Sequence, residues 1–131
     1  MNAITREKLL KMALVAFGVI FFLIYPLGMI WPSGWIWHGG EGTYYLQMIC
    51  GVYAVLGAFL IMAARNPDEN RSLISFTVWS SIVHAGIMAA QAVGDHQHES
   101  GHLLGDVPAL LLVAAVLWFL SPAKATAPVA A

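Results

Sequence analysis

Histidines and acids concentrate in two short segments of this sequence and could bind a metal ion. They are His38, Glu41, His96, His98, His102 and Asp106. Neutral imidazole and carboxylate are the usual ligands of divalent zinc, copper, nickel and manganese. His98 and His102 are spaced i, i+4, so they would share one face if the next helix began early. The pattern predicts a zinc or copper site, but it fits no named motif, and a solvated polar loop is the favoured alternative.

A second set of polar residues follows the spacing of one helical face inside an apolar segment. His84, Met88, Gln91 and Asp95 are spaced i, i+4, i+7 and i+11. An ionisable residue deep in a membrane segment is costly and usually faces the bundle interior, a partner or water. The spacing therefore predicts a polar stripe that leads from one end of the helix into the bundle.

Three interpretations of His84 stay open. In the favoured one, His84 hydrogen-bonds across helices, as Ser80 and Gln91 would, with about 0.6–2 kcal/mol for each bond. In the second, His84 and Met88 bind a metal with the histidine-rich segment, and the Met thioether favours copper over zinc. In the third, His84 is an axial haem ligand. Haem is disfavoured because no other apolar segment contains a histidine that could be the second ligand.

An enzymatic site is also disfavoured. A proton-transfer or redox site would combine His84 with Glu41 or Asp95, but the sequence contains no nucleophile–base pair and no cofactor motif. The single cysteine, Cys50, excludes a CxxC redox pair.

The composition indicates that these residues are positioned within a membrane. Of the 131 residues, 60% are hydrophobic and 10% are charged, and the mean hydropathy is +0.75. Soluble domains contain about 25% charged residues. A chain this apolar requires lipid as its solvent. The formal net charge of −1 disfavours nucleic-acid binding.

Four apolar segments each have the ~20 residues needed to cross a bilayer. They cover residues 9–30, 43–64, 71–93 and 103–120. Short joints place consecutive helices side by side and antiparallel. The sequence thus predicts an all-α fold, an up-down-up-down four-helix membrane bundle within residues 1–121. The low-complexity tail 122–131 is expected to be disordered.

The basic residues predict the orientation of this bundle. All six fall on one side of the four-span arrangement: Arg6, Lys8, Lys11, Arg65, Arg71 and Lys124. The positive-inside rule makes that side cytoplasmic, so both termini are expected inside and the histidine-rich segments outside.

Proline and polar residues predict where helices begin or bend. In the 65–71 joint, Asn66 could be an N-cap, Pro67 suits the first helical position, and Glu69 could complete a capping box. A helix is therefore expected to begin near Pro67, although the favoured role of Asn66, Glu69 and Arg71 is a solvated hairpin. Pro26 and Pro108 are expected to kink helices or mark their ends.

Small residues indicate close helix contacts within the bundle or between protomers. They are Gly51, Ala54, Gly57, Ala58, Ala85, Gly86, Ala89 and Ala90. The favoured function is accordingly a structural or accessory component that forms a homo-oligomer or joins a larger membrane complex. Metal binding or transport, and His-dependent redox or proton transfer, are the alternatives.

Residues 66–92, about a fifth of the chain, resemble a group of small bacterial four-span proteins of the DUF6632 type. The resemblance is carried by residues 66–76 and 79–92, which include Asn66, Arg71, Trp79, His84, Met88 and Gln91. It implies a multi-pass protein of the bacterial inner membrane and brings no established activity.

Overall fold

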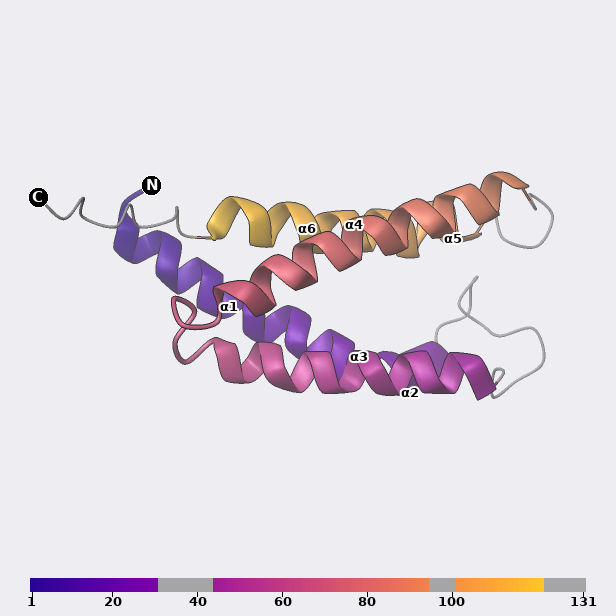
Figure 1. Cartoon of the computed structure of the whole chain (residues 1–131), viewed down its shortest axis with the longest axis horizontal. Helices are drawn as coiled ribbons and strands as arrows, with labels where there is room; N and C mark the ends of the chain where they lie inside the picture. The colour runs from indigo at the N-terminus through magenta and orange to yellow at the C-terminus, as the bar shows by residue number, and fades with distance from the viewer. Residues whose placement is uncertain (31–43, 95–100, 122–131) are drawn as a thin grey trace, which may run out of the picture.

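The structure, a computed structural model, describes residues 1–30, 44–94 and 101–121, and all regular elements within them are α-helices. These are α1 (Ala3–Phe22), α2 (Ile24–Ile30), α3 (Tyr44–Ala63), α4 (Arg71–Gly94), α5 (Gly101–Leu104) and α6 (Asp106–Leu120). The predicted all-α class is confirmed. The start of α1, the end of α6 and the α3–α4 turn all lie at the same end of the molecule (Figure 1). The tail 122–131 lies outside the described residues.

Three helices of the described part are long and apolar enough to cross a membrane. They are α3, α4 and the combined stretch Gly101–Leu120. α1 and α2 pass the same test only as a pair, and their axes differ by 62°. The described chain thus has three candidate spans, or four if the bent pair forms one. The predicted segment 9–30 contains a break at Leu23, three residues before Pro26, the residue expected to kink that helix or mark its end.

Pro26 explains the break between α1 and α2. The backbone at Leu23 leaves the helical range, with φ −96° and ψ 9°. Pro26 follows three residues later; it has no N–H to donate, and its ring crowds the carbonyl of Phe22. Pro108 does not break its helix, because it lies in the first turn of α6, where backbone N–H groups have no intrahelical partner.

The connection between α3 and α4 is a turn, and α4 begins at Arg71 rather than near Pro67 as predicted. The Asn70 backbone N–H donates to the Pro67 carbonyl at 3.1 Å, and the Asn70 side-chain amide donates to the Asn66 carbonyl at 2.9 Å. Such local hydrogen bonds offer the backbone an alternative to helix. Glu69 consequently lies in the turn and not in the first turn of the helix.

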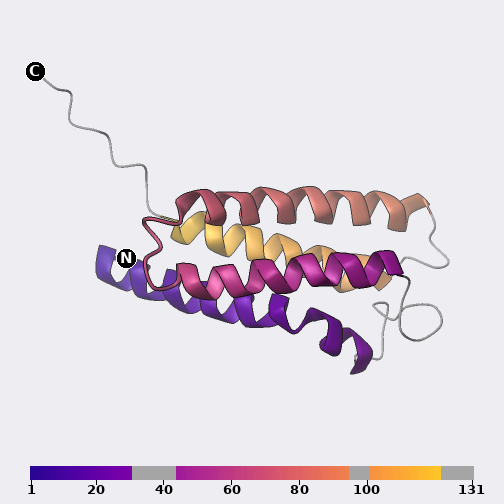
Figure 2. The same cartoon turned by 60° about the horizontal axis from the view of Figure 1, so that its bottom comes forward.

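Two closely packed helix pairs make up the structure. α1 packs along α3, and α4 packs along α6, where the Trp79 and Trp118 rings meet edge to face at 5.9 Å between centroids. α3 and α4 contact each other little. They diverge away from their turn in Figure 1, and Figure 2 shows α6 between them. The short joint therefore does not produce the extensive side-by-side packing predicted for these consecutive helices.

Arg6 joins the first helix to the last. Its Nε donates to the Leu120 carbonyl at 3.2 Å, and its Nη2 donates to the Phe119 carbonyl at 3.1 Å and to the Ser121 carbonyl. The last carbonyls of a helix have no partner within it, so a cation there satisfies them and complements the helix dipole. Arg6 thus closes the bundle at the end where α6 stops.

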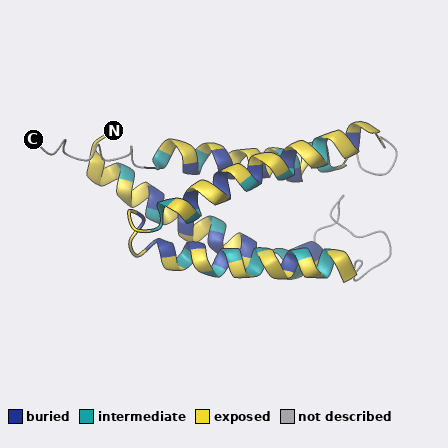
Figure 3. Ribbon diagram, viewed as in Figure 1, coloured by how far each residue is buried: buried dark blue, intermediate teal, exposed yellow. Residues whose placement is uncertain are grey.

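The apolar core lies nearer that end, between all four long helices. Its buried residues are Leu10, Leu14, Phe21, Leu60, Ala63, Ala64, Ile74, Val78, Val113, Ala114 and Leu117. The outward faces of the same helices are exposed (Figure 3), and they include large apolar side chains such as Phe59, Phe76 and Phe119. Apolar side chains both inside and outside are the pattern of helices whose solvent is lipid.

Two glycines bring the backbones of α1 and α3 into contact. A Cβ added to Gly18 would lie 2.8 Å from the Gly57 carbonyl oxygen and 2.7 Å from Cγ1 of Ile61. A Cβ added to Gly57 would overlap the Gly18 carbonyl oxygen. Gly51, on the same helix as Gly57, would meet no atom within 4 Å. Only glycine fits at the first two positions, as in other close helix crossings.

Gly57→Ala is expected to destabilise the protein by about 1–3 kcal/mol, because the new methyl group forces α1 and α3 apart. Gly51→Ala is the matched control. It adds the same methyl group in open space and should leave stability unchanged or raise it by up to about 1 kcal/mol. The measurement is thermal unfolding of both purified variants in one detergent. Equal effects of the two substitutions would contradict this packing.

Candidate functional site

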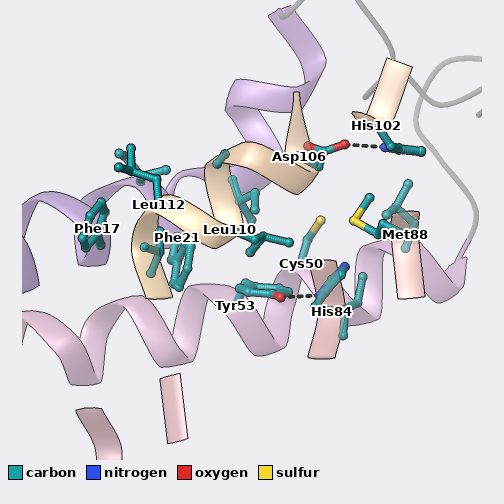
Figure 4. Close-up of a pocket in the computed structure, with 16 residues that line it drawn as sticks. Phe17, Phe21, Cys50, Tyr53, His84, Met88, His102, Asp106, Leu110 and Leu112 are labelled. Carbon is teal, nitrogen blue, oxygen red and sulfur yellow. Dashed lines mark hydrogen bonds and ion pairs between the residues drawn. The ribbon is translucent and has the colours of Figure 1, made fainter. Parts of the chain in front are cut away.

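A pocket of about 270 Å³ lies between the two helix pairs, away from the α3–α4 turn (Figure 4). Its walls are almost entirely apolar. The lining residues with polar or aromatic groups are Phe17, Phe21, Cys50, Tyr53, His84, Met88, His102 and Asp106. All four long helices and the short α5 contribute, so the pocket exists only in the assembled bundle.

Helical periodicity directs two sets of side chains into this pocket. From α3 the lining residues are Leu46, Ile49, Cys50 and Tyr53. From α6 one set is Asp106, Ala109, Leu110 and Val113, and Leu112 lines the pocket outside that set. Each set has the spacing i, i+3, i+4 and i+7, which defines one face of a helix. The two faces meet across the pocket, and the bend after α1 adds Ile24 at its margin.

Tyr53 and His84 form a hydrogen bond across the pocket wall, between α3 and α4. The Tyr53 hydroxyl pairs with Nδ1 of His84, and the two ring centroids are 5.6 Å apart. Phe21 contacts the other side of Tyr53 edge to face, with centroids 5.1 Å apart. His84 thus makes the cross-helix bond expected of it. Ser80 does not, because its hydroxyl donates within α4 to the Thr77 carbonyl at 3.2 Å.

The Tyr53–His84 pair can serve a ligand in either proton arrangement. If the Tyr53 hydroxyl donates to Nδ1, the imidazole carries its proton on Nε2 and can donate from there. If Nδ1–H donates to the phenol oxygen, the phenol proton is available and Nε2 becomes an acceptor. The pair therefore retains one donor and one acceptor for a third group in both cases.

His102 and Asp106 form a second polar pair at the pocket. Nδ1 of His102, in α5, pairs with Oδ2 of Asp106, in the first turn of α6. Asp106 is only 8% exposed. A carboxylate is stabilised at a helix N-terminus. A carboxylate that accepts a hydrogen bond from an imidazole N–H also fixes the orientation of that imidazole ring. Sequence reasoning paired His102 with His98 at i, i+4, whereas the structure pairs it with the residue four positions later.

The predicted stripe reaches the pocket in part. His84 and Met88 line the pocket, whereas Gln91 is exposed and Asp95 lies outside the described residues. The hairpin residues Asn66, Glu69 and Arg71 lie at the opposite end, where the Arg71 guanidinium bonds Asp68 at 2.7 Å.

The metal site stays a prediction. His38, Glu41, His96 and His98 lie outside the described residues. Of the predicted ligands, His102 and Asp106 lie at the pocket and pair with each other. Within residues 1–30, 44–94 and 101–121, no group of three or more His, Cys, Asp or Glu side chains could hold a metal ion.

Tyr53 is the site residue that sequence reasoning missed. It lies inside the apolar segment 43–64, where no charged residue or histidine marks its position. A signal was present, because Tyr53 follows Cys50 by three residues on one helical face, and a buried phenol hydroxyl needs a partner.

Comparison with known proteins identifies a family without a known activity. The profile of a family of unknown function, DUF6632, matches residues 4–129, and the chain therefore belongs to that family. The resemblance seen over residues 66–92 thus extends along nearly the whole chain. No curated protein and no solved structure matches it. The function must consequently be argued from the pocket itself.

A double-mutant cycle tests the bond between Tyr53 and His84. Tyr53→Phe, His84→Leu and the double variant should give a coupling energy of about 0.6–2 kcal/mol, the range for hydrogen bonds between membrane helices. The measurement is reversible unfolding in one mixed-micelle system. Tyr44→Phe, at a position that is 86% exposed, is the control and should show no coupling to His84→Leu. Fully additive effects of Tyr53→Phe and His84→Leu would refute the bond.

Proposed function

We propose that this member of DUF6632 is a multi-spanning membrane protein that binds a small, largely apolar molecule in the pocket between its helices. The observation that carries the proposal is the pocket itself, with apolar walls from every long helix and two polar pairs at its margin. Ligand sites have this character: mostly apolar walls, and few polar groups that fix orientation. They also occur preferentially between the helices of bundles.

The membrane arrangement that we propose is an antiparallel four-helix bundle in the bacterial inner membrane, with α1 and α2 as one bent span. Arg6, Arg65 and Arg71 lie at the end of the bundle where α6 stops and α3 turns into α4. By the positive-inside rule, they support an orientation with that end in the cytoplasm. Both termini are then cytoplasmic. The pocket lies toward the other end and would face the outer half of the membrane.

Self-association is a second proposal. It is supported by small residues against which no other part of the described chain packs. A Cβ on Gly51 or Gly86 would meet no atom within 4 Å, so neither glycine is required by packing within the chain. Such positions permit close contact with another helix in lipid. An accessory role in a larger membrane complex has the same support. A metal site has less support, because it would need ligands from outside the described residues.

Cysteine labelling tests the orientation. Asp68→Cys places a thiol in the α3–α4 turn, and Gly101→Cys places one at the start of α5. A membrane-impermeant maleimide should label Gly101→Cys in intact spheroplasts and Asp68→Cys only after lysis, because the two ends lie on opposite sides of the membrane. The unsubstituted chain is the control, since Cys50 is buried. Labelling of Asp68→Cys in intact spheroplasts would contradict the proposed orientation.

Filling the pocket tests the binding function. Both Ala109 and Ala115 are exposed positions of α6, but only Ala109 lines the pocket. Ala109→Phe therefore adds a ring to the pocket wall, and Ala115→Phe adds the same ring elsewhere. Organic extraction of purified protein followed by mass spectrometry should recover a bound small molecule from the unsubstituted chain and from Ala115→Phe. Ala109→Phe should lose most of it. Equal recovery from both variants would place the bound molecule elsewhere.

A further inference from the structure

We infer that the ligand of this pocket is uncharged and has a carbonyl-bearing ring with an apolar tail, as in a quinone, and that the Tyr53–His84 pair recognises its carbonyl oxygen. The inference rests on the proposed binding function and names the chemical class of the molecule bound. It concerns recognition alone and assigns no redox step.

The charges around the pocket favour an uncharged head group. In the part of the chain that the structure describes, no Lys or Arg side chain lines the pocket. The one carboxylate there, Asp106, is already paired with His102. An anionic head group would thus have no cation dedicated to it, and a cationic one would compete with an existing pair. Burial of an uncompensated charge is costly, so the pocket suits neither.

The hydrogen-bonding groups favour a ligand that contains a carbonyl oxygen. In both proton arrangements, the Tyr53–His84 pair offers one donor to a third group, from either Nε2 or the phenol oxygen. A pure hydrocarbon would fill the apolar volume but leave that donor without an acceptor. An unmatched polar group in an apolar site weakens binding, whereas a carbonyl oxygen accepts the bond.

The aromatic rings and the shape of the pocket favour a single flat ring. Phe21, Tyr53 and His84 form an aromatic part of the wall, with centroids of neighbouring rings 5.1 Å and 5.6 Å apart and their planes tilted by 76° and 51°. Such walls complement flat rings through stacked or edge-to-face contacts. A volume of about 270 Å³ is at the low end for ligand pockets, and it suits one ring rather than a fused set. The rest of the lining is largely aliphatic, with Ile20, Leu110 and Val113 among its residues, and suits an apolar tail.

Three probes with tails of similar length test the inference. They are a 1,4-benzoquinone with a decyl chain, decylbenzene and decanoate, titrated into the purified full-length chain in one non-ionic detergent. We expect the quinone to bind about tenfold more tightly than decylbenzene, the factor that one net hydrogen bond supplies. Decanoate should bind more weakly than the quinone because its carboxylate must be desolvated.

Variants assign the discrimination to the polar pair. Either group alone could still donate to a carbonyl oxygen, so both must be removed. The double variant Tyr53→Phe/His84→Leu should lose the tenfold preference for the quinone over decylbenzene. Tyr44→Phe, at an exposed position of the same helix, is the control and should retain the tenfold preference.

The outcomes separate this inference from the proposed function beneath it. Equal binding of quinone and decylbenzene, both lost in Ala109→Phe, would overturn the carbonyl recognition and leave the binding function in place. A preference for decanoate would overturn the argument from charge. Failure of all three probes to bind, or binding that Ala109→Phe does not reduce, would overturn both.

Discussion

The hydrogen bond between Tyr53 and His84 is the interaction on which the site depends. Helices in lipid satisfy their backbone groups internally, so side chains alone hold the two helix pairs together. At one end, Arg6 ties α1 to the last carbonyls of α6. Farther along, where α3 and α4 have few other contacts, Tyr53 and His84 join them. Between these two levels the apolar core also joins the pairs, and the pocket lies beside the Tyr53–His84 bond.

Packing differs within and between the helix pairs, and residue size explains the difference. Gly18 and Gly57 let the α1 and α3 backbones touch, so no room for a ligand exists between these two helices there. The pocket instead lies between the pairs, where its lining residues include the large side chains of Phe21, Tyr53 and Met88. A rigid pair beside an open interface is a suitable arrangement for binding, because closely packed elements hold the pocket walls in place.

Hydropathy and length predicted most helix positions. In lipid, a long apolar stretch that pairs with no other strand can satisfy its backbone hydrogen bonds only as a helix. Two predicted spans, 43–64 and 71–93, agree with Tyr44–Ala63 and Arg71–Gly94 within a residue at each end. Hydropathy does not change at the break at Leu23, and only Pro26 indicated that this helix would kink or end. Which helices pack closely was not predictable from the joints: α3 and α4 share the short 64–70 connection, yet α4 packs along α6. His84 was predictable as an isolated ionisable residue, whereas its partner Tyr53 resembled the apolar residues around it.

The most direct test of the account is an experimental structure of the full-length chain in lipid, without added ligand. We expect density from a non-protein molecule between α1, α3, α4 and α6, with a polar atom within hydrogen-bond distance of the Tyr53–His84 pair. The contradicting result is a closed interface in which Phe21 and Leu110 meet directly, Tyr53 and His84 have other partners, and no volume is left between the helix pairs.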